Sequence, residues 1–296
     1  MNPTESKWVF VVNPVAGGGA GRTMVPALEQ ELARRSLDAR IALTDSHGHA
    51  SILATNFLQL GYTHFIAVGG DGTFNEMASP LVGRPGLTLG LIPAGTGNDF
   101  IQILGWPDRF GAKEWDLFFE EHVKAMDVGQ VNEHFFFNGM GLGFDAQVAA
   151  ENYVAPDKLA EGKGKSKYLW HIVKTLLFYR EKKIRIRTAE MDVRDDCFMH
   201  TIANGRRFAG DFFLTPDALA DDGLLDVCMI RRLNLLQRFR ILPMVPKGTH
   251  IRDPRVDTHQ TSALNVHFDQ EMPFHIDGEL LFGRSFEVSV LPGPSG

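Results

Sequence analysis

Three glycine-rich segments, each directly after a short apolar run, constrain the fold more than any other feature of this sequence. The runs and the segments that follow them are Trp8–Val12 with 13–22, 65–68 with 69–76, and 87–92 with 93–100. Runs rich in β-branched and aromatic residues are typical of strands, and a glycine turn often leads a strand of a parallel sheet into a helix. Because parallel strands end at the same edge of their sheet, we expect the three segments to lie close together.

The rest of the first 122 residues continues this alternation of strand and helix patterns. A further strand is predicted over Ala39–Leu43, and the stretches 23–36 and 50–60 carry apolar residues at the spacing of amphipathic helices. Strands that alternate with helices indicate βαβ units on a parallel sheet. We therefore predict a doubly wound α/β domain over residues 1–122.

From residue 123 onward, apolar and polar residues alternate, as they do in strands of antiparallel sheets. The clearest alternating runs are 183–187, 198–202, 225–230 and 286–291. They predict a mainly antiparallel β-sandwich domain over residues 123–296, interrupted by one helix at 168–179. The segment 156–167, rich in Lys and Gly, is predicted to be a loop.

Composition excludes several classes of protein. The formal net charge of −6, from 30 Lys and Arg against 36 Asp and Glu, gives no general attraction to nucleic acid. The two cysteines, Cys197 and Cys228, are too few for a disulfide framework and fit a reducing compartment. The run Trp8–Val12 is far too short for a signal peptide or a membrane span. We expect a cytoplasmic protein without a transmembrane segment.

The first glycine-rich segment is ambiguous when it is taken alone. Its order, a strand followed by glycines and then a helix, suits a loop whose backbone N–H groups bind phosphate. It departs from a P-loop because Ala16 stands in place of the first glycine and Arg22 in place of the lysine. It also fails the dinucleotide-binding pattern, which requires a glycine where Arg22 stands.

The second and third segments are more specific. In the second, three glycines surround Asp71, which can hold Mg²⁺ or its water ligands, and Thr73 can cap the helix that follows. In the third, Asp99 lies beside Gly95 and Gly97. Three such segments at one edge of a sheet predict a nucleotide site.

These segments, in this order, resemble the catalytic domain shared by diacylglycerol kinases, sphingosine and ceramide kinases and their bacterial soluble relatives. The resemblance extends over essentially the whole chain. Residues 138–145 look like the family's strand-to-helix crossover, and 219–224 look like the segment that bacterial relatives use for a structural Mg²⁺. Residues 277–279 match the terminal Asp-Gly-Glu motif.

The resemblance implies a kinase that uses ATP and Mg²⁺ to phosphorylate a hydroxyl of a lipid such as diacylglycerol, reached at the membrane surface. The nucleotide contacts that it implies are Asn13, Gly18, Arg22, Thr44, Gly69, Gly70, Asp71, Gly72, Thr73, Phe74, Asn75, Thr96, Asn98 and Asp99. Asp222 would bind the structural Mg²⁺ through its carboxylate, and Leu219 and Leu224 through their carbonyls. The β-rich domain would also contribute the lipid cleft.

Two residues compete for the role of general base. The lipid hydroxyl must lose its proton as it attacks the γ-phosphorus, and the resemblance assigns the accepting carboxylate to Glu279. Some sphingosine kinase relatives are assigned an aspartate of the second segment instead, which here is Asp71. Arg22 is a departure, because bacterial relatives often have lysine at this position.

Two rival functions remain open. An NAD kinase-like phosphotransferase shares the Gly-Gly-Asp-Gly-Thr motif, but the Gly-Thr-Gly-Asn-Asp motif and the terminal Asp-Gly-Glu favour a lipid kinase. The other rival is a catalytically silent, lipid-binding regulatory module. Asp71, Asp99 and Glu279 argue against it, because a silent copy has no chemical need for those carboxylates. The motifs name neither the lipid nor the oligomeric state, and a homodimer is one option.

Four features also have a plain structural explanation. Residues 277–279 can form only a turn between strands, and the helix at 168–179 can belong to the core instead of lining an acyl-chain cleft. His47 and His49 suggest a metal site, but we expect His49 to begin a helix because no third ligand is apparent. The stretch 231–240 is either a basic helix that contacts anionic lipid or a helix with leucines in the core and arginines in water.

Overall fold

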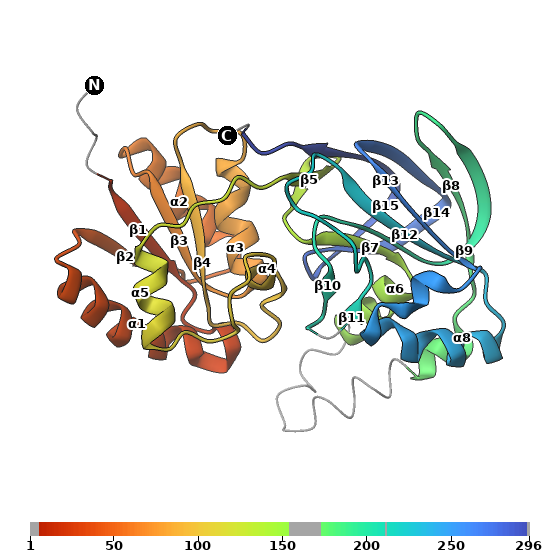
Figure 1. The fold of residues 1–296 in the computed structure, drawn as a ribbon, viewed down its shortest axis with the longest axis horizontal. Coiled ribbons are helices and arrows are strands. Elements are labelled where there is room, and N and C mark those ends of the chain that lie inside the picture. The colour runs from red at the N-terminus through yellow and green to blue at the C-terminus, as the bar shows by residue number, and fades with distance from the viewer. Residues whose placement is uncertain (1–5, 154–172, 211, 295–296) are drawn as a thin grey trace. The chain divides into compact units, whose positions relative to one another are not determined.

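The chain forms two compact units, shown in Figure 1. The computed structural model describes residues 6–153, 173–210 and 212–294. The two units are Met1–Lys124 and Ala125–Gly296.

The first unit is built on a four-stranded parallel sheet with the strand order β2-β1-β3-β4. Its strands are β1 (Trp8–Val12), β2 (Ala39–Leu43), β3 (His64–Gly69) and β4 (Thr88–Pro93). The order reverses between β1 and β3, which is the arrangement of a doubly wound sheet. Every residue of β1 and β3 is buried, which explains why both read as continuous apolar runs.

Helices cover both faces of this sheet. They are α1 (Ala16–Arg35), α2 (His49–Gln59), α3 (Asp71–Ala78), α4 (Asp99–Ile103) and α5 (Ala112–Phe119), with a 3₁₀ turn η1 (Ser79–Leu81). On one face, Phe10 packs with Leu28 of α1 and Trp115 of α5. Val9 and Val11 point to the opposite face, where α2 and α3 contact β1 and β3. The predicted doubly wound α/β fold is confirmed.

The second unit is mainly antiparallel, as predicted. Its larger sheet contains β5 (Val128–Val131), β6 (His134–Phe136), β7 (Gly139–Gly143), β8 (Lys182–Arg187), β9 (Asp192–Ala203), β12 (Leu225–Arg231), β13 (Val256–Thr261), β14 (Ala263–Ile276) and β15 (Glu279–Leu291). A small hairpin consists of β10 (Arg207–Phe208) and β11 (Phe212–Phe213). The helical elements are α6 (Phe144–Tyr153), α8 (Leu235–Ile241), η3 (Leu242–Lys247) and η4 (Thr249–Arg252). The predicted loop at 156–167 and residues 168–172 of the helix predicted at 168–179 lie outside the described residues, and 173–178 are helical.

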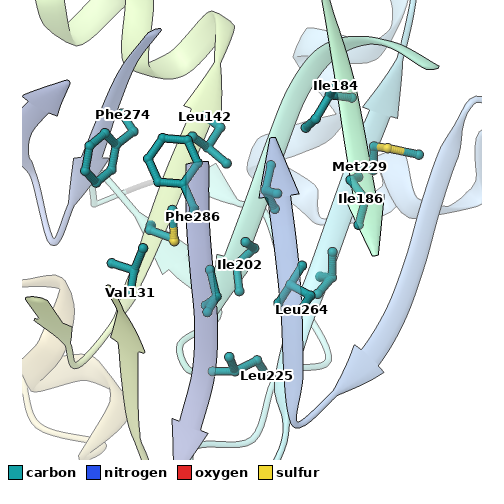
Figure 2. Close-up of a cluster of buried hydrophobic side chains, with 14 of the residues drawn as sticks. Val131, Leu142, Ile184, Ile186, Ile202, Leu225, Met229, Leu264, Phe274 and Phe286 are labelled. Atoms are coloured by element: carbon teal, nitrogen blue, oxygen red, sulfur yellow. The ribbon is translucent and has the colours of Figure 1, made fainter. Parts of the chain in front are cut away.

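Two long strands organise the second unit. One end of β9 and one end of β14 pair with β8, and their other ends pair with β7. The strands thereby surround one apolar core, drawn in Figure 2. In this core the rings of Phe274 and Phe286 meet edge to face with centroids 4.7 Å apart, a favourable aromatic geometry.

The helix predicted over 231–240 is shorter, and its packing agrees only in part with the alternative of leucines in the core and arginines in water. Arg231 belongs to β12, and α8 begins only at Leu235. Arg238 is buried, whereas Leu235 and Leu236 are exposed. The expectation holds for the buried Leu233 and for the exposed Arg231, Arg232 and Arg240. It fails for Arg238, because its guanidinium pairs with the largely buried carboxylate of Glu181, 2.7 Å away.

Candidate active site

The glycine-rich segments follow β1, β3 and β4, and the structure brings them into contact at the carboxyl edge of the sheet. The N–H of Asn13 donates to the carbonyl of Val68 at 3.0 Å, and the Asn13 amide donates to Thr73 Oγ1 at 3.1 Å. These bonds fasten the first segment to β3 and to the second segment. Thr73 does not cap the helix as predicted, because it lies inside α3. Gly17 lies against the third segment, because a Cβ there would stand 2.2 Å from the carbonyl oxygen of Ala94. The three segments therefore converge.

The second and third segments touch backbone to backbone at Gly70 and Gly95. A Cβ added to Gly95 would stand 2.4 Å from the Cα of Gly70, which no side chain can tolerate. The N–H groups of Ala94 and Gly95 both donate to the carbonyl of Gly69, at 2.7 and 3.0 Å. Asn98 closes the third segment, since its Oδ1 accepts from the Gly95 N–H at 3.0 Å and its Nδ2 donates to the Gly95 carbonyl at 3.1 Å.

Asp71 joins the same two segments through its side chain. One carboxylate oxygen accepts the N–H of Asp99 at 2.9 Å and the other accepts the N–H of Phe100 at 3.0 Å. Burial raises the pKa of the Asp71 carboxyl, and these two N–H groups lower it in part. The ring of Phe100 stacks on Phe74 with centroids 4.1 Å apart, so the contact continues into the core. Asp71 therefore has a structural role whatever else it does.

Open space lies beside the backbone of several glycines around this edge. An added Cβ would meet nothing within 4 Å at Gly18, Gly19, Gly48 or Gly72. Gly18 and Gly19 have φ of +68° and +105°, which other residues rarely adopt. A backbone without side chains in such a turn lets an anionic group approach its N–H groups closely, as phosphate-binding loops do.

The other residues predicted to contact the nucleotide lie around the same edge. Arg22 on α1 and Thr96 in the third segment are exposed. Thr44, just after β2, is largely buried, and its N–H donates to the carbonyl of Val12 at 2.8 Å. Asn75 accepts a hydrogen bond from the Ser79 hydroxyl at 3.0 Å. Their roles toward a nucleotide stay predictions.

The two histidines near Thr44 contact separate carboxylates. His49 begins α2, as expected, and its Nδ1 lies 2.7 Å from Asp45. His47 lies 2.7 Å from Glu76, which also accepts the N–H of Gly48 at 3.0 Å. Glu76 thus positions the segment before α2. No local sequence pattern indicates this role, because it links residues 28 positions apart.

The Asp-Gly-Glu motif forms a hairpin turn in the second unit. Ile276 of β14 pairs with Glu279 of β15, so Asp277 and Gly278 make a two-residue turn with φ of +46° and +89°. The Asp277 carboxylate accepts the N–H groups of residues 137–139, at 2.8 to 3.0 Å. The turn is therefore held against the start of β7. Glu279 is exposed as the first residue of β15, and its role as a base stays a prediction.

A carboxylate–imidazole pair lies close to this turn in the sequence and in the sheet. His275 Nε2 stands 3.1 Å from an Asp145 oxygen, and Asp145 lies in the first turn of α6, directly after β7. Gly141 of β7 makes room for the pair, since a Cβ there would stand 2.1 Å from Asp145 and 2.3 Å from His275. The sequence analysis assigned this pair no role. The glycine-rich pattern of β7 was the signal that could have indicated it.

The predicted metal segment contains close carboxylates. Asp222 accepts the N–H of Leu224 at 3.0 Å with one oxygen and the Gln260 amide at 3.1 Å with the other. The pKa of the nearby Asp226 carboxyl is raised, mainly by burial and also by the charges of Asp222 and Asp217. The hydrogen bond from Gln260 lowers this pKa in part. The Asp222 and Asp226 carboxylates share the Gln260 amide, so a cation at this segment would meet two negative groups.

Asp127 anchors this segment and was missed by the sequence analysis. Its carboxylate accepts the N–H groups of Gly223 at 2.7 Å and Gly293 at 2.8 Å, and its own N–H donates to Ala220 at 2.8 Å. Leu219 is exposed. Within the described parts of the chain, no group of three or more His, Cys, Asp or Glu is arranged to hold a metal. A cation at this segment would therefore need carbonyl oxygens such as those of Leu219 and Leu224.

The comparisons with known proteins match both units. The diacylglycerol kinase catalytic domain family matches residues 7–131, and the YegS C-terminal NAD kinase β-sandwich-like domain matches residues 138–294. A diacylglycerol kinase of Staphylococcus haemolyticus is 28% identical over 272 residues, which cover 91% of this chain and 81% of that protein. An Enterobacter protein (strain 638) named "Probable lipid kinase YegS-like" is 30% identical over 280 residues, covering 93% and 91% of the two chains.

A solved structure has the same fold. The crystal structure of a diacylglycerol kinase from Bacillus anthracis strain Sterne superposes with a TM-score of 0.73 at 22% identity, covering 99% of this chain and 96% of that one. The chain belongs to the diacylglycerol kinase catalytic-domain family, with a YegS-type second domain. The resemblance seen in the motifs is confirmed, and a lipid kinase is the class of enzyme that these relatives support. None of the helices in the described ranges is long and apolar enough to span a bilayer.

We predict that Gly95→Ala destabilises the first unit by about 1–3 kcal/mol, the usual cost of forcing a methyl group into a packed contact. The reason is the 2.4 Å approach of that Cβ to the Cα of Gly70. Gly72→Ala is the matched control, since its Cβ meets nothing within 4 Å and the residue lies in α3. Denaturant unfolding followed by circular dichroism measures both. Equal stability of the two variants would contradict the close approach of the segments.

Proposed function

We propose that this protein is an ATP-dependent lipid kinase that transfers the γ-phosphate of ATP to a hydroxyl of a lipid such as diacylglycerol. The observation that carries the proposal is the convergence of three glycine-rich segments, with open backbone beside them, at the carboxyl edge of a parallel sheet. Ligands of open α/β sheets bind at this edge. Family membership supports the lipid as acceptor.

The first unit would bind the nucleotide. Gly18, Gly19 and Gly72 leave room for phosphate oxygens against the backbone, and Arg22 on α1 offers a guanidinium for charge pairing. Mg²⁺, when bound with ATP, would neutralise phosphate charge. Each Asp71 oxygen accepts one N–H and keeps a further lone pair, so its carboxylate fits a contact to the ion's water ligands. Asp71 would also hold the third segment in place.

The second unit would supply the base. The lipid hydroxyl has a pKa far above neutrality, and its proton must pass to a neighbouring group as the oxygen bonds to phosphorus. Glu279 is exposed at the end of a turn that Asp277 fixes to residues 137–139, so its backbone is held rigidly. The carboxylate would accept the proton while the terminal phosphate oxygen of ADP leaves.

Transfer of label from ATP tests the proposal. The protein is incubated with γ-labelled ATP, Mg²⁺ and a total lipid extract, and in parallel with NAD. We expect label in a lipid, whose identification names the acceptor. Label in the dinucleotide would instead support the NAD kinase-like alternative, and label in neither would support a silent module.

We predict that Glu279→Gln keeps ATP affinity and folding but lowers turnover by about 10²- to 10⁴-fold, because glutamine cannot accept the proton. A loose transition state, which needs little activation of the nucleophile, would put the loss at the low end of that range. Turnover within about twofold of wild type would show that the base lies elsewhere.

Asp71→Asn is the comparison variant for this measurement. The carboxylate accepts N–H groups with both oxygens, and an amide presents only one acceptor. We therefore expect weaker ATP binding and a lower melting temperature as well as lost turnover. If Asp71→Asn instead binds ATP normally and fails only in chemistry, Asp71 is the base.

We also propose that Asp222 and the carbonyls of Leu219 and Leu224 bind a structural Mg²⁺. We predict that the melting temperature of wild type is higher in Mg²⁺ than in chelator, and that the melting temperature of Asp222→Ala is the same in both. A ligand that binds only the folded state stabilises it by about 2.7 kcal/mol at a hundredfold excess over Kd. Asp221→Ala, the exposed neighbour, is the control and should keep the Mg²⁺ effect. An equal Mg²⁺ effect in Asp222→Ala would remove the ion from this segment.

A further inference from the structure

Large apolar side chains gather on the outer side of α8 and of the helical residues 173–178. Phe178 is 74% exposed and Leu236 is 82% exposed. We name the α8 surface for the five exposed residues Leu177, Phe178, Leu235, Leu236 and Phe239. In α8, Phe239 follows Leu236 by three positions and Leu235 by four, so all three lie on one side of the helix.

Hydrogen bonds show that the two segments are neighbours. Nη1 of Arg238 donates to the carbonyl of Leu176 at 2.6 Å, and Nη2 donates to the carbonyl of Tyr179 at 2.9 Å. Leu176 and Tyr179 face the core, so Leu177 and Phe178 between them face outward beside α8. Figure 1 shows α8 on the outside of the second unit.

Arg238 explains why leucines of α8 point to solvent. Its guanidinium is buried, pairs with Glu181 at 2.7 Å and donates through Nε to the carbonyl of Leu233 at 3.2 Å. It also lies over the ring of Phe198, 5.2 Å from the centroid. A buried cation with this many partners fixes the rotation of the short helix. The opposite face, with Leu236, is thereby held outward.

The two stretches that carry the α8 surface are basic although the whole chain has a net charge of −6. Residues 173–180 and 232–247 contain no Asp or Glu. The exposed cations of these two stretches are Lys174, Arg180, Arg232, Arg240 and Lys247. Three of them have a carboxylate at 3.4 to 3.9 Å, a distance at which exposed ion pairs contribute little.

We propose that the α8 surface docks this protein onto the anionic face of a lipid bilayer. Apolar side chains would enter the headgroup region while the surrounding Lys and Arg meet acidic headgroups, as in helices that lie in a membrane interface. An exposed patch of this kind without a function is a liability for a protein in water. The inference deepens the proposed function, because a lipid kinase must reach its substrate in a membrane.

Vesicle sedimentation without nucleotide tests docking separately from catalysis. The probes are phosphatidylcholine vesicles and vesicles of phosphatidylcholine with an equal share of phosphatidylglycerol. We expect wild type to bind the anionic vesicles. Each basic residue near an anionic leaflet contributes a factor of about five, so Arg232→Gln with Arg240→Gln should weaken binding by about tenfold or more.

A separate double variant tests the contribution of the apolar side chains to vesicle binding. Phe178→Ser with Leu236→Ser should weaken binding to both kinds of vesicle by at least about tenfold, because two large apolar groups are removed. The matched control is Ile52→Ser with Leu60→Ser, two similarly exposed residues of the first unit. Melting temperatures confirm folding. Binding that is unchanged in both α8 pairs, or equally reduced in the control, overturns the proposal.

Two further measurements distinguish failure of the docking proposal from failure of the proposed kinase function. If α8 variants keep vesicle binding but dissociate a homodimer in analytical ultracentrifugation, the surface is an interface between copies and docking is overturned. Phosphate transfer to lipid dispersed in detergent micelles tests the kinase function without a bilayer. Transfer there without vesicle binding refutes docking alone, and vesicle binding through α8 without any transfer refutes the kinase function alone.

Discussion

The carboxylate of Asp71 is the contact on which the arrangement of the first unit's loops depends. It binds two successive N–H groups at the start of α4, while Gly70 beside it meets Gly95 backbone to backbone. The strand ends alone would bring the segments near each other. These contacts, together with the hydrogen bonds from Ala94 and Gly95 to Gly69, fix one loop relative to the next. The open glycines lie beside loops that are held in this way.

Aspartate carboxylates also accept several backbone N–H groups in the second unit. Asp277 binds the N–H groups of residues 137–139, and Asp127 binds those of Gly223 and Gly293. In each case a carboxylate satisfies several backbone donors that have no partner in a regular strand or helix, which is worth more than a neutral hydrogen bond. Buried or half-buried aspartates therefore hold loops in both units.

The fold was predictable because its signals are local. Continuous apolar runs such as Trp8–Val12 indicated buried parallel strands, and alternation after residue 123 indicated antiparallel ones. The contacts around the candidate sites were not predictable, because they join residues far apart in sequence. Asp71 and Phe100 are 29 positions apart, and Asp277 and Phe137 are 140 apart. The burial of Arg238 against Glu181, 57 positions away, could not be predicted for the same reason.

Asp71 and Asp277 hold backbone segments in place. Their presence in a sequence therefore does not by itself indicate catalytic activity. In a lineage that lost catalysis, selection for folding alone would retain both aspartates and the glycine pair 70 and 95, because each replacement breaks backbone contacts. Glu279, exposed at the start of β15, would be expected to change first. In such a lineage, intact glycine motifs would therefore indicate only that the fold is kept. An intact Glu279 would indicate that the catalytic chemistry is kept.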